Sequence, residues 1–344
     1  MFSSHRQRDL RATVPQRPSL RLASSAEHHA RITARLTARD RWVARLLAEH
    51  RVLSSPQITQ AAFGSRSAAN QRLQRLYTWR ICDRFQPYIG RGRAPMCYVL
   101  DTTGAHLLAH ADGLNPAELK FRPDRSIGIA HSLRLAHLLG VNEFFTSLIA
   151  AARTETPTRA LTAWWPETRA ARHFGDHVRP DAYGRWREHD REIEWFLEWD
   201  TGSYQLSRLT AKLPGYAALA ATTGIITPLL IVFAGPIREV HARRGFTEHL
   251  RTSARPHDVP IATTTVTDLQ AADSPAAAIW LPLNAREPDR RRLIDLPAAW
   301  PHVDPPTSSE TTEPAEAATS PTPRLAPPEP MPPYTTAELS WNPR

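Results

Sequence analysis

Three carboxylates stand at the ends of two neighbouring runs in which apolar and polar residues alternate. Asp181 opens the first run, and Glu198 and Asp200 close the second, whose sequence is EIEWFLEWD. Two such runs joined by a short polar stretch are typical of adjacent β-strands. Because strand side chains alternate between faces, Glu198 and Asp200 share one face, and we expect Asp181 to meet Glu198 across the ladder. Carboxylates gathered in this way repel one another unless a cation lies among them.

A divalent metal ion and a basic side chain are the two usual cations for such a cluster. Lys212 follows the second strand on a helical run, and it is one of only two lysines among 43 basic residues. A compact ammonium cannot be exchanged freely for a guanidinium fork, so a lysine in this arginine-rich chain indicates a specific requirement. The helical run is interrupted by Pro214-Gly215, where we expect a kink or a restart.

The chemistry that these residue types suit is phosphodiester hydrolysis. Carboxylates would hold Mg²⁺, the metal would acidify a water molecule, and the ammonium would neutralise developing charge. The predicted catalytic residues are Asp181, Glu198, Asp200 and Lys212, of which Asp181, Glu198 and Asp200 would be the metal ligands. The alternative is that the acids are strand-end surface residues, paired with Arg185 or Arg208.

The basic charge of the chain is concentrated near its start. The net charge is +9, yet residues 1–95 alone hold 18 arginines against five acids, while the chain from Pro301 onward is acidic. A basic excess confined to one module is the electrostatic footprint of a nucleic-acid-binding domain, although a solvated arginine-rich surface has the same composition. Cys82 and Cys97 lack metal-ligand spacing and fit a reducing, cytoplasmic location. No apolar run approaches the length of a membrane helix, so no membrane partner is expected.

Three short helices are predicted over residues 37–50, 54–64 and 65–80, followed by two β-prone runs, 85–89 and 96–100, around an arginine-rich tip. This order is that of a winged helix, whose third helix enters the major groove and whose hairpin tip contacts phosphate or the minor groove. In the third helix an apolar stripe faces inward, which leaves a polar face for base edges. The predicted contacts to double-stranded DNA are Ser67, Gln71, Gln74, Arg75, Arg91 and Arg93. The alternative is a winged helix used for protein contacts.

The rest of the chain predicts an α/β domain between two unstructured ends. A long helix from His131 precedes a strand at 161–165, the two carboxylate-bearing strands, the helix with Lys212 and a buried strand at 229–234. The predicted boundaries are a disordered basic arm at 1–34, the winged helix at 35–110, a linker at 111–130, the α/β domain at 131–285 and a Pro-rich disordered tail at 286–344. The expected fold class is therefore α+β.

Several of these motifs resemble those of the replication-relaxation family. The resemblance rests on RPDAY, EWFLEWDTG, HSLRLAH and LYTWRICDRF…YVLDTTG, and covers roughly residues 35–285. It implies a link to the replication or maintenance of plasmids and other mobile DNA, and contacts with replication or transfer machinery. A homo-oligomer is compatible with this.

The order helix, three strands, helix, strand is similar to that of the PD-(D/E)XK nuclease-like fold, which implies a Mg²⁺-dependent DNA endonuclease. On that resemblance Asp181 is the first motif acid and Glu198 the second. The sequence departs from the motif where Asp200 replaces its lysine, and Lys212 would supply the ammonium from the next helix. Two hypotheses therefore stand: a DNA-binding protein with a metal-dependent nuclease domain, and a non-catalytic DNA-binding or regulatory protein with an inactive nuclease-like domain.

Overall fold

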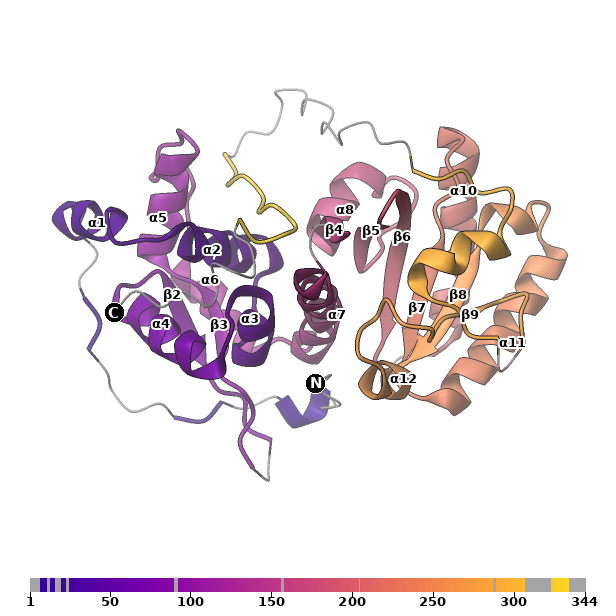
Figure 1. Ribbon diagram of the computed structural model, residues 1–344, viewed down its shortest axis with the longest axis horizontal. Helices are drawn as coiled ribbons and strands as arrows, with labels where there is room; N and C mark the ends of the chain where they lie inside the picture. Colours follow the sequence, from indigo (N-terminus) through magenta and orange to yellow (C-terminus); the bar gives the residue numbers. More distant parts are fainter. Residues whose placement is uncertain are drawn as a thin grey trace. The chain divides into compact units, whose positions relative to one another are not determined.

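The computed structural model describes residues 7–10, 13–15, 20–22, 25–89, 92–155, 158–203, 205–286, 289–306 and 323–333 (Figure 1). The chain separates into two compact units. The helical unit contains the described residues between His5 and Asn142 together with the tail residues 323–333. The sheet unit contains the described residues between Glu143 and Pro306. Both mix helices and strands, and the fold class is α+β, as predicted.

The helical unit is built from short helices and a small antiparallel sheet. Its helices are α1 Ala26–Thr33, α2 Ala38–His50, α3 Ser55–Ala62, α4 Arg66–Thr78, α5 Thr102–Ala111 and α6 Pro123–Ile127. Its strands are β1 Leu53–Ser54, β2 Cys82–Phe85 and β3 Cys97–Leu100, which form a sheet in the order β1-β3-β2. The three expected helices and the hairpin are present, and β1 adds an edge strand that was not predicted.

Side-chain caps determine where the central helices of this unit begin. Thr37 and Ser54 each form a reciprocal capping box with the residue three positions on, and Ser65 accepts a hydrogen bond from the backbone at the start of α4. Each cap satisfies backbone N–H groups that the first helical turn leaves without partners. The cap of α3 is Ser54.

Apolar side chains from β2, β3 and the first part of α7 (Leu135–Thr154) form a core under the small sheet. Phe85, Val99 and Leu135 are among its buried members. Asn142 donates a hydrogen bond to the backbone oxygen of Val52 at 2.6 Å. The start of α7 therefore belongs to the helical unit, and Ile129 and Ala130, expected in a linker, are buried in the same core.

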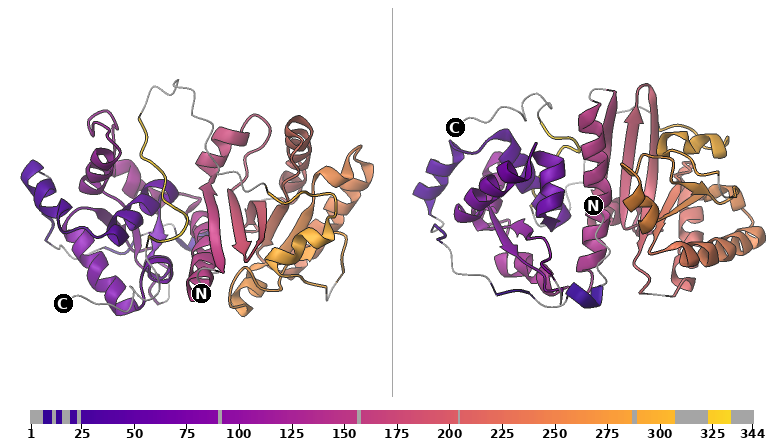
Figure 2. Two further views of the ribbon diagram at one scale, coloured as in Figure 1. Left: turned by 45° about the horizontal axis from the view of Figure 1, so that its top comes forward. Right: turned by 60° about the horizontal axis from the view of Figure 1, so that its bottom comes forward.

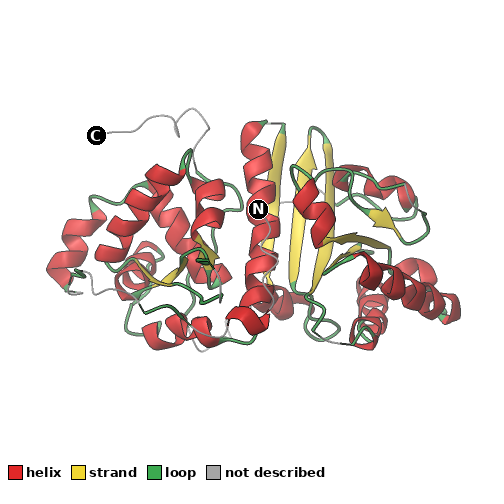
Figure 3. Cartoon of the chain, turned by 90° about the horizontal axis from the view of Figure 1, so that it is seen from below, coloured by secondary structure: helices red, strands yellow, loops and turns green. Residues whose placement is uncertain are grey.

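The sheet unit is organised around one six-stranded mixed sheet, visible in Figure 3. The strands lie in the order β4 (Arg159–Pro166), β5 (Ala182–Glu188), β6 (Arg191–Asp200), β7 (Leu229–Phe233), β8 (Ile261–Thr265) and β9 (Leu281–Pro282). β4, β5 and β6 are antiparallel, β6, β7 and β8 are parallel, and β9 is antiparallel to β8. The connecting helices are α8 Glu167–Phe174, α9 Ser207–Thr210, α10 Leu213–Thr223, α11 Pro236–Thr252 and α12 Val266–Ala271.

Both faces of this sheet are covered, because successive side chains of β6 pack against different helices. Trp195 stacks against Phe145 of α7, and Phe196 contacts Tyr216 of α10. Figure 2 shows α7 running alongside the antiparallel strands. Gly184 in β5 lets α7 approach closely, since a Cβ at this position would lie 2.7 Å from a ring atom of Phe145. The alternation inferred from EIEWFLEWD is thus present, with both faces buried.

Both ends of the chain contain more structure than the sequence predicted. Within the predicted arm, α1 buries Ile32, and Arg21 forms ion pairs with Asp83 and Asp101. Within the predicted tail, a 3₁₀ helix spans Leu293–Ala299, and its apolar side chains enter the core of the sheet unit. These segments are short, but each carries enough apolar or paired side chains to pack against a larger unit.

Helix α7 also modifies the expectation about membrane segments. By length and composition it could cross a membrane, with a hydropathy of 1.4 over its most apolar window, but 61% of that window is buried inside the protein. This burial is typical of a core helix. The length and composition of α7 alone do not exclude a membrane helix, and it is the burial of α7 that indicates a core helix.

Candidate functional site

The pairing of β5 with β6 brings Asp181 opposite Glu198, as the sequence predicted. Ala182 pairs with Leu197, and the backbone N–H of Asp181, just before β5, donates to the oxygen of Leu197 at 3.0 Å. Lys212 occupies the position before α10, where the helix restarts with Pro214 in its first turn. Proline is tolerated there because backbone N–H groups in the first turn have no hydrogen-bond partner within the helix, so the N–H that proline lacks is not missed. The restart aims Lys212 at the end of β6.

Glu198 is held by two side chains from this helix start. The ammonium nitrogen of Lys212 lies 2.7 and 2.6 Å from the two carboxylate oxygens, and the Tyr216 hydroxyl donates to Oε1 at 2.7 Å. Lys212 also donates to the backbone oxygen of Arg179 at 3.3 Å. The Glu198 side chain is only 3% exposed. The basic side chain considered for this cluster is therefore in contact with Glu198.

Burial and charge have opposite effects on this pair. The pKa of Glu198 is raised to about 7, with burial as the main cause and the Asp181 charge acting in the same direction, while the ammonium of Lys212 opposes both. For Lys212, burial lowers the pKa, but the charges of Glu198 and Asp181 more than offset it and the pKa is raised. Burial has the larger effect on the pKa of Glu198 because that side chain is almost fully buried, whereas 36% of the Lys212 side chain is exposed. Burial and the Glu198 charge also raise the pKa of Tyr216 well above its ordinary value.

Asp181 belongs to the same electrostatic cluster as Glu198. One oxygen of its carboxylate accepts a hydrogen bond from the Trp199 backbone N–H at 2.8 Å. Its charge raises the pKa of both Glu198 and Lys212, and Glu167 at the start of α8 acts on Lys212 in the same direction. Three carboxylates therefore act on one ammonium, and Asp181 and Glu198 meet as predicted.

Asp200 is engaged elsewhere, which differs from the predicted grouping. Its carboxylate forms a two-pronged ion pair with Arg238, in which the Arg238 Nη2 to Oδ1 distance is 3.0 Å. It also accepts from the Gly202 backbone N–H at 3.2 Å. The alternative prediction, that the acids are surface residues, gave Arg185 as one possible partner. Arg185 pairs with Glu194 instead, at 2.9 Å. Asp200 is buried rather than on the surface.

The predicted ligand side chains do not form a Mg²⁺ site in their present arrangement. Lys212 and Tyr216 hold Glu198, Arg238 holds Asp200, and a backbone N–H binds Asp181. Within the described ranges no group of three or more His, Cys, Asp or Glu side chains could hold a metal ion. Mg²⁺ binding stays a prediction.

Sequence reasoning missed Arg238 and gave Tyr216 and Glu167 no role. A signal for Arg238 existed: it lies just after β7, which is parallel to β6, and Asp200 pairs with Phe233 at the matching end. Side chains that follow adjacent parallel strands meet at one edge of a sheet. Tyr216 lies four residues after Lys212, on the same side of α10.

The second candidate surface is the exposed side of α4. Ala69, Leu73 and Leu76 are buried, and the opposite positions, Ser67, Gln71, Gln74 and Arg75, are exposed. Gln74 accepts a hydrogen bond from Arg84 of β2 at 2.7 Å. At the tip between β2 and β3, Arg93 is exposed, and Arg91 lies outside the described residues. The division of α4 into an apolar and a polar side is the one predicted.

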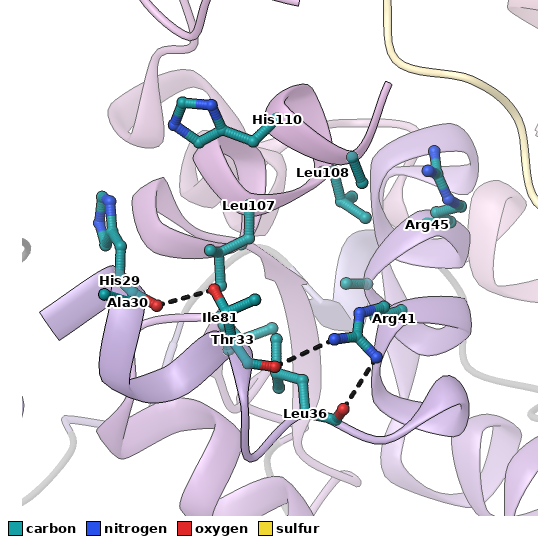
Figure 4. A pocket seen from close by; sticks show the side chains of 13 residues that line it. His29, Ala30, Thr33, Leu36, Arg41, Arg45, Ile81, Leu107, Leu108 and His110 are labelled. Atoms are coloured by element: carbon teal, nitrogen blue, oxygen red, sulfur yellow. Dashed lines mark hydrogen bonds between the residues drawn. The ribbon is translucent and has the colours of Figure 1, made fainter. Parts of the chain in front are cut away.

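A cavity of about 550 Å³ lies in the helical unit between α1, α2 and α5 (Figure 4). Its wall is largely apolar and includes His29 and His110. Arg41 donates to the backbone oxygens of Leu36 and Thr33 at 2.8 and 3.0 Å. Burial, and then the charge of neighbouring histidines, lowers the pKa of His29, which favours its neutral form at pH 7. The size is that of a small-molecule site.

Fold and site together define a class: an α+β protein with a small helical unit and a mixed-sheet unit that carries a buried, lysine-paired carboxylate cluster. The model of the replication-relaxation family matches residues 45–230, which is more than half of the chain. The chain belongs to the replication-relaxation family. Comparisons with curated proteins and with solved structures found no match.

Proposed function

We propose that this protein binds double-stranded DNA through α4 and the β2–β3 hairpin, in a process of replication or of mobile-element maintenance. The observation that carries the proposal is α4 itself, a helix with one buried apolar side and one exposed side of polar and basic residues. Family membership suggests the process, and the exposed helix suggests the ligand.

The order of elements supports a winged-helix module. The order α2, β1, α3, α4, β2, β3 with the sheet order β1-β3-β2 is the arrangement in which α4 is the recognition helix and the β2–β3 hairpin is the wing. Donor and acceptor groups of Gln71 and Ser67 suit base edges, and arginine suits phosphate. Arg93 at the hairpin tip would reach the backbone or the minor groove.

The charge on this surface has the sign that the proposal needs. α4 contains no acidic residue, and Arg66 and Arg75 are exposed on it. By contrast, Arg72 on the same helix turns inward and pairs with buried Asp40. The arginines of α4 thus divide into one that stabilises the fold and two that face solvent, where phosphate contacts would form.

For the sheet unit we propose a PD-(D/E)XK-like fold in a non-catalytic role. The order α7, β4, α8, β5, β6, α9, α10, β7, with β7 parallel to β6, supports the fold, with α8 as an addition between its first two strands. The occupied carboxylates of Glu198 and Asp200 favour the non-catalytic alternative over a Mg²⁺-dependent nuclease. In this role the Lys212–Glu198 pair joins the start of α10 to the sheet.

A salt titration of the full chain tests the DNA proposal. Binding to a labelled duplex is measured by fluorescence anisotropy across a range of salt, for wild type and for the double variant Arg75→Ala, Arg93→Ala. Each lost phosphate contact should lower the slope of log K against log salt by about 0.9, so the double variant should lose about 1 to 2 units of slope. Arg244 is an exposed arginine on α11, and Arg244→Ala is the matched control, which should change neither the affinity for DNA nor the salt slope. Equal slopes for wild type and the double variant would refute a role for this surface.

A metal titration separates the two roles of the sheet unit. If Glu198 and Asp200 are structural, Mg²⁺ and Mn²⁺ should give no more thermal stabilisation than Ca²⁺ at equal ionic strength, and plasmid DNA should remain uncut. A real site filled at 100 times its dissociation constant would add about 2.7 kcal/mol. Stabilisation of that size that is lost in Asp181→Ala, or metal-dependent cleavage, would favour the nuclease.

A further inference from the structure

A proline-rich segment far along the chain lies against α2. Residues 323–333, yellow in Figure 1, have the sequence PRLAPPEPMPP. Pro328 and Pro332 within this segment are buried. The indole N–H of Trp42 donates to the backbone oxygen of Glu329 at 2.8 Å, and Arg45 Nη1 donates to that of Ala326 at 2.9 Å. The segment belongs to the helical unit.

The contacts match what a proline-rich backbone can offer. Six of these eleven residues are prolines, which have no N–H and leave mainly carbonyl oxygens for recognition. The face of α2 supplies donors, an indole and a guanidinium. The backbone N–H of Ala326, within the segment, donates to Asp112 Oδ2 at 2.8 Å.

The spacing of donors and acceptors also corresponds. Ala326 and Glu329 are three residues apart, and carbonyls three apart share a side when a proline-rich chain adopts its preferred three-residue turn. Trp42 and Arg45 are three apart on a helix and also share a side. Asp112, at the end of α5, forms an ion pair with Arg45. This ion pair orients the guanidinium that donates to the segment.

We propose that the face formed by Trp42, Arg45 and Asp112 is a recognition site for proline-rich peptide, and that its occupant is residues 323–333 of the same chain. Proline-rich peptides lose little conformational freedom on binding, so two or three directed hydrogen bonds and two buried prolines are sufficient for specific docking. Aromatic side chains that contact such segments are a recurrent mode of peptide recognition.

The test uses the full chain with Pro328→Ser and Pro332→Ser, which should release the tail. A fluorescent peptide of the wild-type sequence 323–333 should bind this variant and bind wild type at least tenfold more weakly, because wild type has its own tail in place. Adding Trp42→Phe to the released-tail variant keeps the ring and removes the donor, so affinity should fall about five- to tenfold. A peptide carrying both serine substitutions is the control and should not bind.

Two results would overturn the proposal. One is that the peptide fails to bind the released-tail variant, and the other is that wild type binds it equally well. Should the released-tail variant not fold, trypsin cleavage after Arg324 in wild type gives a second measurement. Excess unlabelled peptide, and separately Trp42→Phe, should each accelerate that cleavage by freeing the tail. An unchanged rate in both cases would count against the site.

Discussion

The raised pKa of Glu198 makes the stability of the protein depend on pH in a predictable direction. The value is about 7 in the folded protein, against an ordinary value of 4.5, with burial as the main cause. The folded state therefore holds this proton more firmly than the unfolded chain does. The contribution of Glu198 to stability is fully present below about pH 4.5 and is lost as the pH rises through about 7.

The size of the effect follows from the two values. A tenfold difference in proton affinity corresponds to about 1.4 kcal/mol, so the whole change is worth about 3 kcal/mol. Most of it, about 2 to 3 kcal/mol, falls between about pH 5 and pH 8. This exceeds the contribution expected of an exposed ion pair, so it should be measurable.

The assay is urea unfolding of wild type and Glu198→Gln at several pH values in that interval. Glutamine has nearly the same shape and does not titrate, so the difference in unfolding free energy between the two proteins isolates this group. That difference should shift by about 2 to 3 kcal/mol in favour of the glutamine variant as the pH rises. Glu248→Gln, at an exposed position of α11, is the control and should show a constant difference. A constant difference for Glu198→Gln as well would refute the reasoning.

Two further predictions concern neighbouring packing. Lys212→Met removes the ammonium from buried Glu198 and should cost about 3 to 5 kcal/mol at pH 8, where the carboxylate is charged, and less at pH 5, as measured by urea unfolding; an equal cost at both values would contradict the pairing. Gly184→Ala would place a methyl group 2.6 Å from a ring atom of Trp195, and should cost about 1 to 3 kcal/mol in thermal unfolding. Gly128→Ala, where a Cβ meets nothing within 4 Å, is the control.

The sequence predicted those features that interactions between residues close together in the chain determine. The alternation in EIEWFLEWD identified the two faces of β6, and the rarity of lysine singled out Lys212, which pairs with Glu198. The apolar stripe of α4 was also evident from the sequence. These features depend on side-chain period and on composition, both of which act within a few residues.

Contacts between distant segments were beyond the sequence patterns. Arg238 reaches Asp200 only because β7 pairs with β6 in parallel, and this pairing lies outside any local window. The tail was assigned to disorder because its composition cannot build a core of its own. A segment that docks on an existing unit needs no core, and here two buried prolines and three hydrogen bonds were sufficient.

The Glu198–Lys212–Tyr216 arrangement also bears on how this protein can change over generations. Losing the lysine alone leaves a buried carboxylate, and losing the glutamate alone leaves an ammonium and a buried hydroxyl without their main acceptor. Each single replacement is costly, whereas replacing the charged pair together by apolar residues of similar volume can be neutral. The two positions are therefore expected to be inherited as a unit across the family, with descendants keeping both charges or neither.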